Sequence, residues 1–206
     1  MTHAAVPSFI VKVCGITNEE DARLAIEAGA NAVGMNFYAR SPRFISVDGA
    51  RDIGRSLPSD VLKVGVFVNA SEGELINAAE QVPLDVVQLH GETLPARFPK
   101  SVRVWRSMVV GGTLLEGVEA YVLDAPTPDF GGSGRSFDWT MAADFPYRKI
   151  IAGGLDGANV GAAIHTTAPW GVDACSRLEA RPGKKDARRV RDFVRAALAA
   201  MQQEVG

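Results

Sequence analysis

The chain has 206 residues, of which 47% are hydrophobic and 22% are charged, a composition typical of a globular domain with a sizeable core. Its formal net charge of -2 gives no general attraction to nucleic acid or to anionic membrane, so neither is an expected partner. The sequence has no run of about 18 apolar residues and no N-terminal secretory pattern, so we expect a cytoplasmic protein.

Short apolar, β-branched runs alternate with amphipathic segments along the whole chain, which is the pattern of repeated βα units. Eight strands are predicted, at residues 9–14, 31–37, 62–68, 84–89, 101–105, 120–124, 149–152 and 170–174. Helices are predicted over 19–28, 48–56, 72–81, 94–98, 137–143, 156–165 and 186–201, with a turn near 114–116. Asn18 and Asp21 have the spacing of a capping box, and Gly29 marks the end of the first helix.

Eight strands with intervening helices predict a closed (β/α)₈ barrel, built as one domain over residues 1–206. This length is near the minimum for that fold, so we expect abbreviated helices after strands four, five and six. An open doubly wound sheet is the competitor, but Cys14-Gly15-Ile16-Thr17 lacks its Gly-rich fingerprint. The Pro/Gly-rich stretch at 126–135 is either a loop beside the site or an ordinary surface turn.

A metal site has little support, because cysteine and histidine are scattered through the chain without ligand spacing. These residues are Cys14, Cys175, His3, His90 and His165.

Cys14 follows the first predicted strand, at the barrel end where ligands bind. Lys12 shares its strand face, since side chains alternate. An ammonium beside a thiol favours the thiolate, so Cys14 is a candidate general base. The alternative is that Lys12 points outward and Cys14 is inert packing.

Asp124 ends the sixth predicted strand, directly before the Gly-rich loop. A closed barrel would bring it to the same rim as Cys14, and such an acid and base are what isomerisation of a sugar needs. An aspartate at a strand end is otherwise a common cap or turn former.

Five further positions are candidates for ligand binding. Gly153 and Gly154 follow the seventh strand, where barrels often hold phosphate with backbone N–H groups. Arg43 lies in the loop after strand two and could hold a carboxylate in its planar fork, or it could be a solvated surface side chain. Gln88 and His90 share a face on strand four, so they line the pocket or form a satisfied polar pair.

Taken together, the motifs resemble the phosphoribosylanthranilate isomerase family from about Val11 to Asp186. The motifs that carry the resemblance are Lys12–Thr17, Phe37–Arg43, Val64–Asn69, Val87–Gly91, Asp124 with Gly131–Gly134 and Phe137–Trp139, Gly153–Leu155, Gly171–Asp173, and Glu179 with Pro182–Asp186.

The resemblance implies a cofactor-free Amadori rearrangement in tryptophan biosynthesis, in a monomer or homodimer acting on a small molecule. Asp124 would match the general acid and Cys14 the general base. Arg43 would match the residue near the anthranilate carboxylate. The loops at Gly153, Gly154, Asp173 and Ser176 would match those around the phosphate.

Two alternatives stay open at this point. One is a related histidine-pathway or dual-pathway aminoaldose isomerase, which would be expected to use two aspartates. The other is a non-catalytic phosphosugar-binding barrel, which would need no facing acid and base.

The chain departs from the family after Asp173. Many relatives carry Ser-Ser-Gly after this aspartate. This chain instead reads Ala174-Cys175-Ser176-Arg177, with Arg177 in place of the glycine. Arg177 would either add a charge-assisted contact with the phosphate or point to solvent, and we expect it to point to solvent. Strand eight lies beside strand one in a closed barrel, so we hypothesise that Cys175 lies near Cys14, close enough for oxidation to link them; the alternative is a shielded, inert Cys175.

Overall fold

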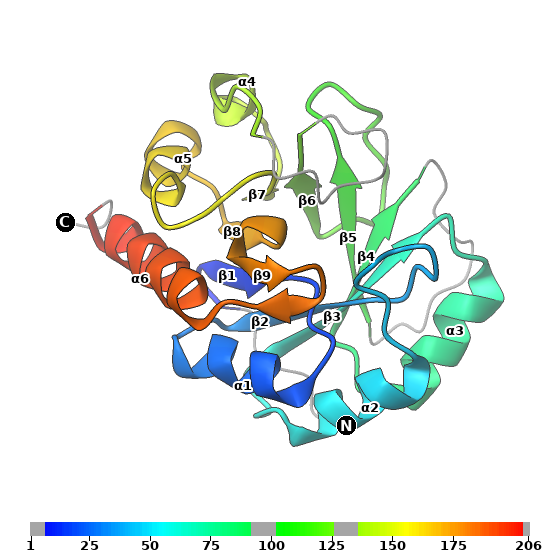
Figure 1. Cartoon of the computed structure of the whole chain (residues 1–206). Helices are drawn as coiled ribbons and strands as arrows, with labels where there is room; N and C mark the ends of the chain where they lie inside the picture. Colours follow the sequence, from blue (N-terminus) through cyan, green and yellow to red (C-terminus); the bar gives the residue numbers. More distant parts are fainter. Residues whose placement is uncertain (1–6, 92–101, 126–135, 204–206) are drawn as a thin grey trace.

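Eight parallel strands close into a barrel in the computed structural model, which describes residues 7–91, 102–125 and 136–203 (Figure 1). The strands are β1 (Ile10–Val13), β2 (Ala32–Asn36), β3 (Leu62–Val68), β4 (Val86–His90), β5 (Arg103–Met108), β6 (Ala120–Leu123), β7 (Lys149–Ile151) and β8 (Gly171–Ala174). Each strand pairs with the next in the chain, and β8 pairs with β1. The predicted (β/α)₈ barrel is confirmed, with strand ends within three residues of those expected.

The strands are apolar on both faces because each face is buried in a different layer. Inward side chains form a core inside the barrel, which runs from Ile10 on β1 to Ile150 on β7 and includes the fully buried Trp105. Outward side chains such as Val11 and Val13 belong to a second core under the helices. This double burial explains the nearly continuous apolar runs in the sequence.

The described residues form six α-helices, which pack on the outside of the barrel (Figure 1). They are α1 (Glu19–Glu27), α2 (Val47–Ser56), α3 (Glu72–Gln81), α4 (Thr140–Ala143), α5 (Val160–Thr167) and α6 (Ala187–Gln203). Asn18 caps α1 as predicted, since the Asp21 amide donates to its Oδ1 at 2.9 Å. The second bond of a capping box differs, because the Asp21 carboxylate accepts from Nδ2 of Asn18 at 2.9 Å in place of the Asn18 backbone amide. None of the described helices is both long and apolar enough to cross a membrane.

The helices α4 and α5 begin three and four residues later than the sequence predicted. The chain turns before α4, where the Asp138 carboxylate accepts from the Thr140 amide and hydroxyl. It also turns before α5, where Asp156 accepts from the Ala158 amide. A short acidic side chain that binds the backbone two residues ahead favours a turn over a helix. The predicted helix at 94–98 and the loop at 126–135 lie outside the described residues.

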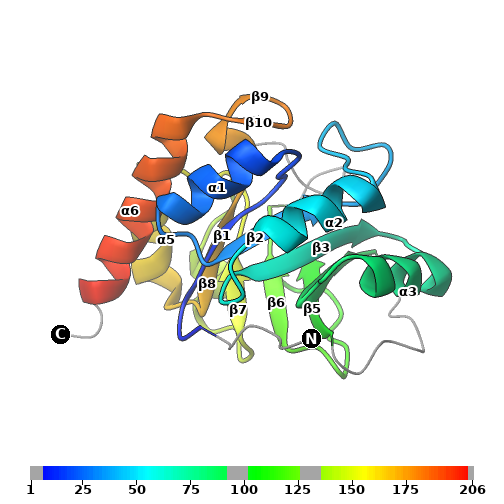
Figure 2. The ribbon, with the colours of Figure 1, turned by 90° about the horizontal axis from the view of Figure 1, so that it is seen from below.

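A hairpin that the sequence did not predict follows β8. A 3₁₀ turn (Ser176–Leu178) leads into β9 (Glu179–Arg181), which pairs antiparallel with β10 (Lys184–Lys185). Gly183 makes the tight turn with a φ of +79°, a conformation that favours glycine. The hairpin lies beside the beginning of α1 (Figure 2), and Lys184 Nζ contacts Oδ1 of Asp21 at 2.8 Å.

Candidate active site

Cys14 and Asp124 come directly after β1 and β6, at the carboxyl ends of two strands of the same parallel barrel. The Cys14 amide donates to the carbonyl of Ala174 at 2.9 Å, and the Asp124 amide donates to the carbonyl of Met108 at 3.0 Å. These bonds continue the barrel ladder for one residue beyond each strand. Both side chains are half-buried, which leaves them accessible to a ligand at this rim.

Lys12 is fully buried inside the barrel, as its alternation with Val11 and Val13 predicted. Its Nζ lies 2.7 Å from Oδ2 of Asp173 on β8. Burial alone would lower the pKa of Lys12, but the ion pair with Asp173 and the nearby Cys14 outweigh it and raise that pKa. The barrel therefore keeps a charged ammonium beneath the rim.

Gly34 on β2 makes the space in which the Cys14 sulfur lies. A Cβ at position 34 would be 2.6 Å from Sγ of Cys14 and 3.1 Å from Cε of Lys12. A side chain there would displace both groups, so the glycine permits this close approach. The signal for this close approach in the sequence is a glycine inside an apolar strand.

The surroundings of Cys14 favour its thiolate. A hydrogen bond with the Cys175 thiol has the largest effect, burial opposes it, and the charge of Lys12 adds to it. Together they lower the pKa of Cys14 to about 7. The same hydrogen bond and burial raise the pKa of Cys175. The first proton lost by the two thiols therefore leaves Cys14 as the thiolate.

The surroundings of Asp124 favour its neutral form. Burial raises its pKa most, the Ala125 amide opposes this at 2.7 Å, and the charge of Asp173 adds to the rise. The pKa of Asp124 is raised to about 6. Gly153 permits this burial, because a Cβ at position 153 would be 2.8 Å from Oδ1 of Asp124. This packing role of Gly153 was not foreseen.

Gln88 and His90 form a polar group on β4 together with Ser107 on β5. Nε2 of Gln88 donates to the Ser107 hydroxyl at 2.8 Å and lies 3.4 Å from Nε2 of His90. Burial first, and then the charges of Lys12 and Arg106, lower the pKa of His90 to about 3. His90 is therefore a neutral hydrogen-bonding group at physiological pH and does not act as an acid there.

Arg43 is not a solvated surface side chain, and part of its guanidinium is already hydrogen-bonded within the protein. Its Nε and Nη2 donate to the two carboxylate oxygens of Glu179, each at 2.8 Å. This bidentate pair uses one edge of the guanidinium, so a ligand carboxylate would have to bind at the end that carries Nη1. Glu179 was noted in the sequence only as part of the family motif, and its contact with Arg43 spans 136 residues.

The positions predicted for phosphate binding lie in the two loops after β7 and β8. Gly153 and Gly154 have φ values of +82° and +60°, and Ser176 begins the 3₁₀ turn. The Asp173 side chain, in contrast, points into the barrel toward Lys12. A carboxylate repels phosphate, so the backbone after Asp173 is the better candidate for contact with that group.

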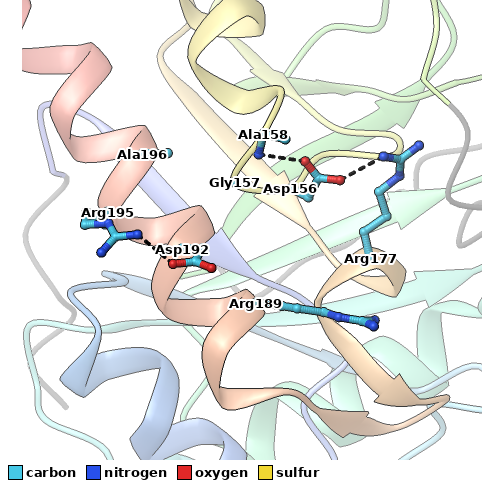
Figure 3. A pocket seen from close by; sticks show the side chains of 8 residues that line it. All are labelled: Asp156, Gly157, Ala158, Arg177, Arg189, Asp192, Arg195 and Ala196. Carbon is cyan, nitrogen blue, oxygen red and sulfur yellow. Dashed lines mark hydrogen bonds and ion pairs between the residues drawn. The ribbon is translucent and has the colours of Figure 1, made fainter.

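Arg177 is exposed to solvent, as expected, and it also forms an ion pair. Its Nη1 lies 2.8 Å from Oδ2 of Asp156, so the ion pair connects the loop after β7 to the loop after β8. Figure 3 shows this pair at the edge of a separate pocket of about 600 Å³, between the beginning of α5 and α6. The pocket is lined by Asp156, Gly157, Ala158, Arg177, Arg189, Asp192, Arg195 and Ala196.

Cys175 lies beside Cys14, as the barrel register requires. Val13 is opposite Ala174, so the next residue of each strand follows at the spacing of adjacent strands, about 4.8 Å. This spacing is below the limit of about 7 Å between Cα atoms for a disulfide. Both cysteines are free thiols in the structure. The neighbourhood is confirmed, and the oxidative link stays a prediction.

We expect hydrogen peroxide to join Cys14 to Cys175 and to abolish turnover, and dithiothreitol to restore it. Peroxide would oxidise the Cys14 thiolate to a sulfenic acid, and the Cys175 thiol would then displace water from it. Peptide mapping by mass spectrometry checks the link. In Cys175→Ser, peroxide should still inactivate the enzyme but leave no linked peptide. Inactivation of the unmodified chain without such a peptide contradicts the prediction.

Comparison with known proteins gives the family. The model described as N-(5'phosphoribosyl)anthranilate (PRA) isomerase matches residues 11–196. The chain belongs to this family. A relative from Solibacter usitatus named N-(5'-phosphoribosyl)anthranilate isomerase is 44% identical over 200 residues, covering 94% of this chain and 99% of the relative. A relative of that name from Thermotoga maritima is 41% identical over 201 residues, covering 91% and 97%.

Solved structures of PRA isomerases agree in fold. The crystal structure of the Thermotoga maritima enzyme has a TM-score of 0.81 at 36% identity, covering 93% of this chain and 99% of that one. TrpF from Jonesia denitrificans has a TM-score of 0.81 at 31% identity, covering 94% and 98%. The chain is thus an isomerase of tryptophan biosynthesis with a (β/α)₈ barrel. In the part of the chain that the structure describes, no group of three or more His, Cys, Asp or Glu could hold a metal.

Proposed function

We propose that this chain catalyses the Amadori rearrangement of N-(5-phosphoribosyl)anthranilate to 1-(2-carboxyphenylamino)-1-deoxyribulose 5-phosphate, with Asp124 as general acid and Cys14 as general base. One observation carries this assignment. The pKa of Asp124 is raised, chiefly by burial, whereas that of Cys14 is lowered, chiefly by the hydrogen bond with the Cys175 thiol. Two titratable groups whose surroundings push their pKa values in opposite directions are the usual mark of acid–base chemistry.

The reaction needs one proton given and one proton taken. Neutral Asp124 donates its proton to the furanose ring oxygen, the ring C–O bond breaks, and the nitrogen lone pair forms a Schiff base. The Cys14 thiolate then removes the proton from the neighbouring sugar carbon, which gives an enolamine. Tautomerisation of the enolamine to the ketone completes the isomerisation. No electron leaves the substrate, so no cofactor is required, and the thiolate forms no covalent bond to carbon.

The substrate's two anionic ends would bind on either side of this acid and base. Arg43 is our candidate for the anthranilate carboxylate, and the amides of Gly153, Gly154 and Ser176 are our candidates for the phosphate. Support comes from a phosphoribosyl anthranilate isomerase structure of 35% identity and TM-score 0.77, covering 93% of this chain and 99% of that one. It is a complex with reduced 1-(o-carboxyphenylamino)-1-deoxyribulose 5-phosphate. A cytoplasmic monomer or homodimer is the setting we propose.

Asp173 offers a third contact. Its Oδ1 is buried and has no hydrogen-bond partner among the described residues, while Oδ2 is held by Lys12. An unpaired buried acceptor is costly unless a ligand satisfies it. A sugar hydroxyl is the donor that this position fits, because Asp173 influences the pKa values of both Cys14 and Asp124.

The test is loss of phosphoribosylanthranilate fluorescence with purified protein, followed against pH. Turnover needs Cys14 deprotonated and Asp124 protonated, so kcat/KM should rise with a pKa of about 6, fall with a pKa of about 7, and peak between them. Roughly one enzyme molecule in twenty would then carry the active combination at the optimum. A profile that is flat from pH 5 to 9 contradicts the acid–base assignment.

The same preparation distinguishes the other hypotheses. Turnover of the histidine-pathway aminoaldose at a rate similar to that of phosphoribosylanthranilate would indicate a dual-pathway enzyme. Binding of phosphorylated sugars with no turnover of either substrate would indicate a non-catalytic barrel. Cys14 in place of a first aspartate favours the phosphoribosylanthranilate substrate.

A further inference from the structure

Glu179 is a buried carboxylate that the proposed chemistry does not use. Its side chain is only 3% exposed. Both of its oxygens accept from Arg43, and Oε1 also lies 3.2 Å from Nζ of Lys185 and accepts from the Gly183 amide at 3.3 Å. Burial alone would raise the pKa of Glu179, but the hydrogen bonds from Arg43 and the charge of Lys185 outweigh it and lower that pKa. Glu179 is therefore an anion held between two cations.

The hairpin that carries Glu179 is fixed to the first βα loop and to α1. The Thr17 hydroxyl donates to the Gly183 carbonyl at 2.6 Å, and the Lys185 amide donates to Oδ2 of Asp21 at 2.9 Å. On the other strand of the hairpin, the Glu179 carbonyl accepts from Nη1 of Arg189 on α6 at 2.7 Å. Glu179 thus has a well-defined position relative to β1, whose end carries Cys14.

Arg43 lies close to the base. A Cβ at Gly15 would be 2.8 Å from Cδ of Arg43 and 2.8 Å from Sγ of Cys175. The hydrogen bonds from Arg43 to Glu179, and then the nearby thiols Cys175 and Cys14, raise the pKa of Arg43 further. The guanidinium is held on one edge by Glu179 and lies beside the reacting centre.

Lys185 keeps this cluster attractive to an anion. Arg43 with Glu179 alone would be neutral, and the fully buried ammonium of Lys185 gives the group of three a net charge of +1. A second carboxylate can therefore approach Arg43 without meeting a net negative site. The single carboxylate of Glu179 between two cationic side chains orients the guanidinium of Arg43 and leaves one net positive charge for the ligand.

We propose that Glu179 is the positioning residue that orients Arg43 for the carboxylate on the aromatic ring of the substrate, and so determines recognition of that carboxylate. This inference rests on the proposed function, because it assigns Arg43 to the anthranilate end. Glu179 touches no substrate atom in this assignment and acts only through Arg43.

The experiment measures two ligands by calorimetry: reduced 1-(o-carboxyphenylamino)-1-deoxyribulose 5-phosphate and the same compound without the carboxylate. The unmodified chain should prefer the carboxylated ligand by at least about tenfold, the range of a charge-assisted hydrogen bond. Glu179→Gln puts an amide NH₂ against the guanidinium, so we expect the preference to fall about tenfold while the affinity for the decarboxylated ligand stays within twofold. KM for substrate should rise more than kcat falls.

Three controls separate positioning from general structure. Glu74→Gln removes a hydrogen-bonded carboxylate from the cap of α3, and it should leave the ligand preference unchanged. Glu179→Asp keeps the charge but shortens the side chain, so it should restore part of the preference. In a double-mutant cycle, adding Glu179→Gln to Arg43→Lys should reduce the preference no further, because Glu179 acts through Arg43.

Four outcomes are informative. A folded Glu179→Gln that keeps the full preference overturns the inference, as does one that loses affinity for both ligands equally. Additive losses in the cycle also overturn it, because Glu179 would then act independently of Arg43. An unmodified chain that neither binds these ligands nor turns over phosphoribosylanthranilate would instead refute the proposed function on which the inference rests.

Discussion

Replacing Cys14 with serine is expected to lower kcat by about three orders of magnitude, within the range of about 10²–10⁴ for loss of a general base. The thiol can lose its proton near neutral pH because the Cys175 hydrogen bond and the charge of Lys12 lower its pKa to about 7. The same surroundings cannot make an alkoxide from serine at that pH. The measurement is kcat from the fluorescence assay, together with the affinity for the reduced product analogue.

The affinity should stay within about threefold in Cys14→Ser, because proton removal occurs only in the transition state. Cys175→Ser is the matched comparison, since it removes a thiol from the neighbouring strand end. A serine hydroxyl can still donate a hydrogen bond to the thiolate, so this variant should lose less than about tenfold in kcat. Near-normal turnover in Cys14→Ser would remove Cys14 from the mechanism.

Sequence alone predicted the elements whose positions depend on strand periodicity. The alternation of side chains placed Lys12 on the same strand face as Cys14, and the parallel topology brought Asp124 to the same rim. Both predictions depend only on the fold and on counting residues from a strand. They needed no knowledge of loop conformation.

The parts that were missed depend on loops and on contacts between distant residues. Strands of two and three residues in the β9–β10 hairpin are too short to show a period, and only the turn signal Pro182-Gly183 marked them. The partner of Arg43 could not be found because Glu179 lies 136 residues away. The sequence therefore placed the proposed acid and the proposed base at one rim, while the residue proposed to orient Arg43 needed coordinates.

Replacing Asp124 with asparagine is expected to lower kcat/KM by about 10²–10³-fold, because asparagine cannot protonate the ring oxygen. Its Oδ1 can still accept from the Ala125 amide, so the local structure should persist. The pH profile should change shape as well. Loss of the Asp124 titration leaves only the requirement for a Cys14 thiolate, so the residual rate should rise with pH through about 7 and then stay level. If the residual rate still rises and then falls with pH, a group other than Asp124 donates the proton.

The same substitution should stabilise the protein above pH 6. The folded pKa of Asp124, about 6, is higher than its usual value of 3.8, so the stability linked to this group is complete below pH 3.8 and is lost as pH rises through 6. Ionised Asp124 is then a buried charge that asparagine lacks. After discounting for its partial exposure, we expect Asp124→Asn to gain about 1–2 kcal/mol in free energy of unfolding at pH 8, and less at pH 4. Urea unfolding at the two pH values measures this difference. If Asp124→Asn loses activity but is no more stable than the unmodified chain at pH 8, the ionised Asp124 carboxylate does not destabilise the fold and the prediction is contradicted.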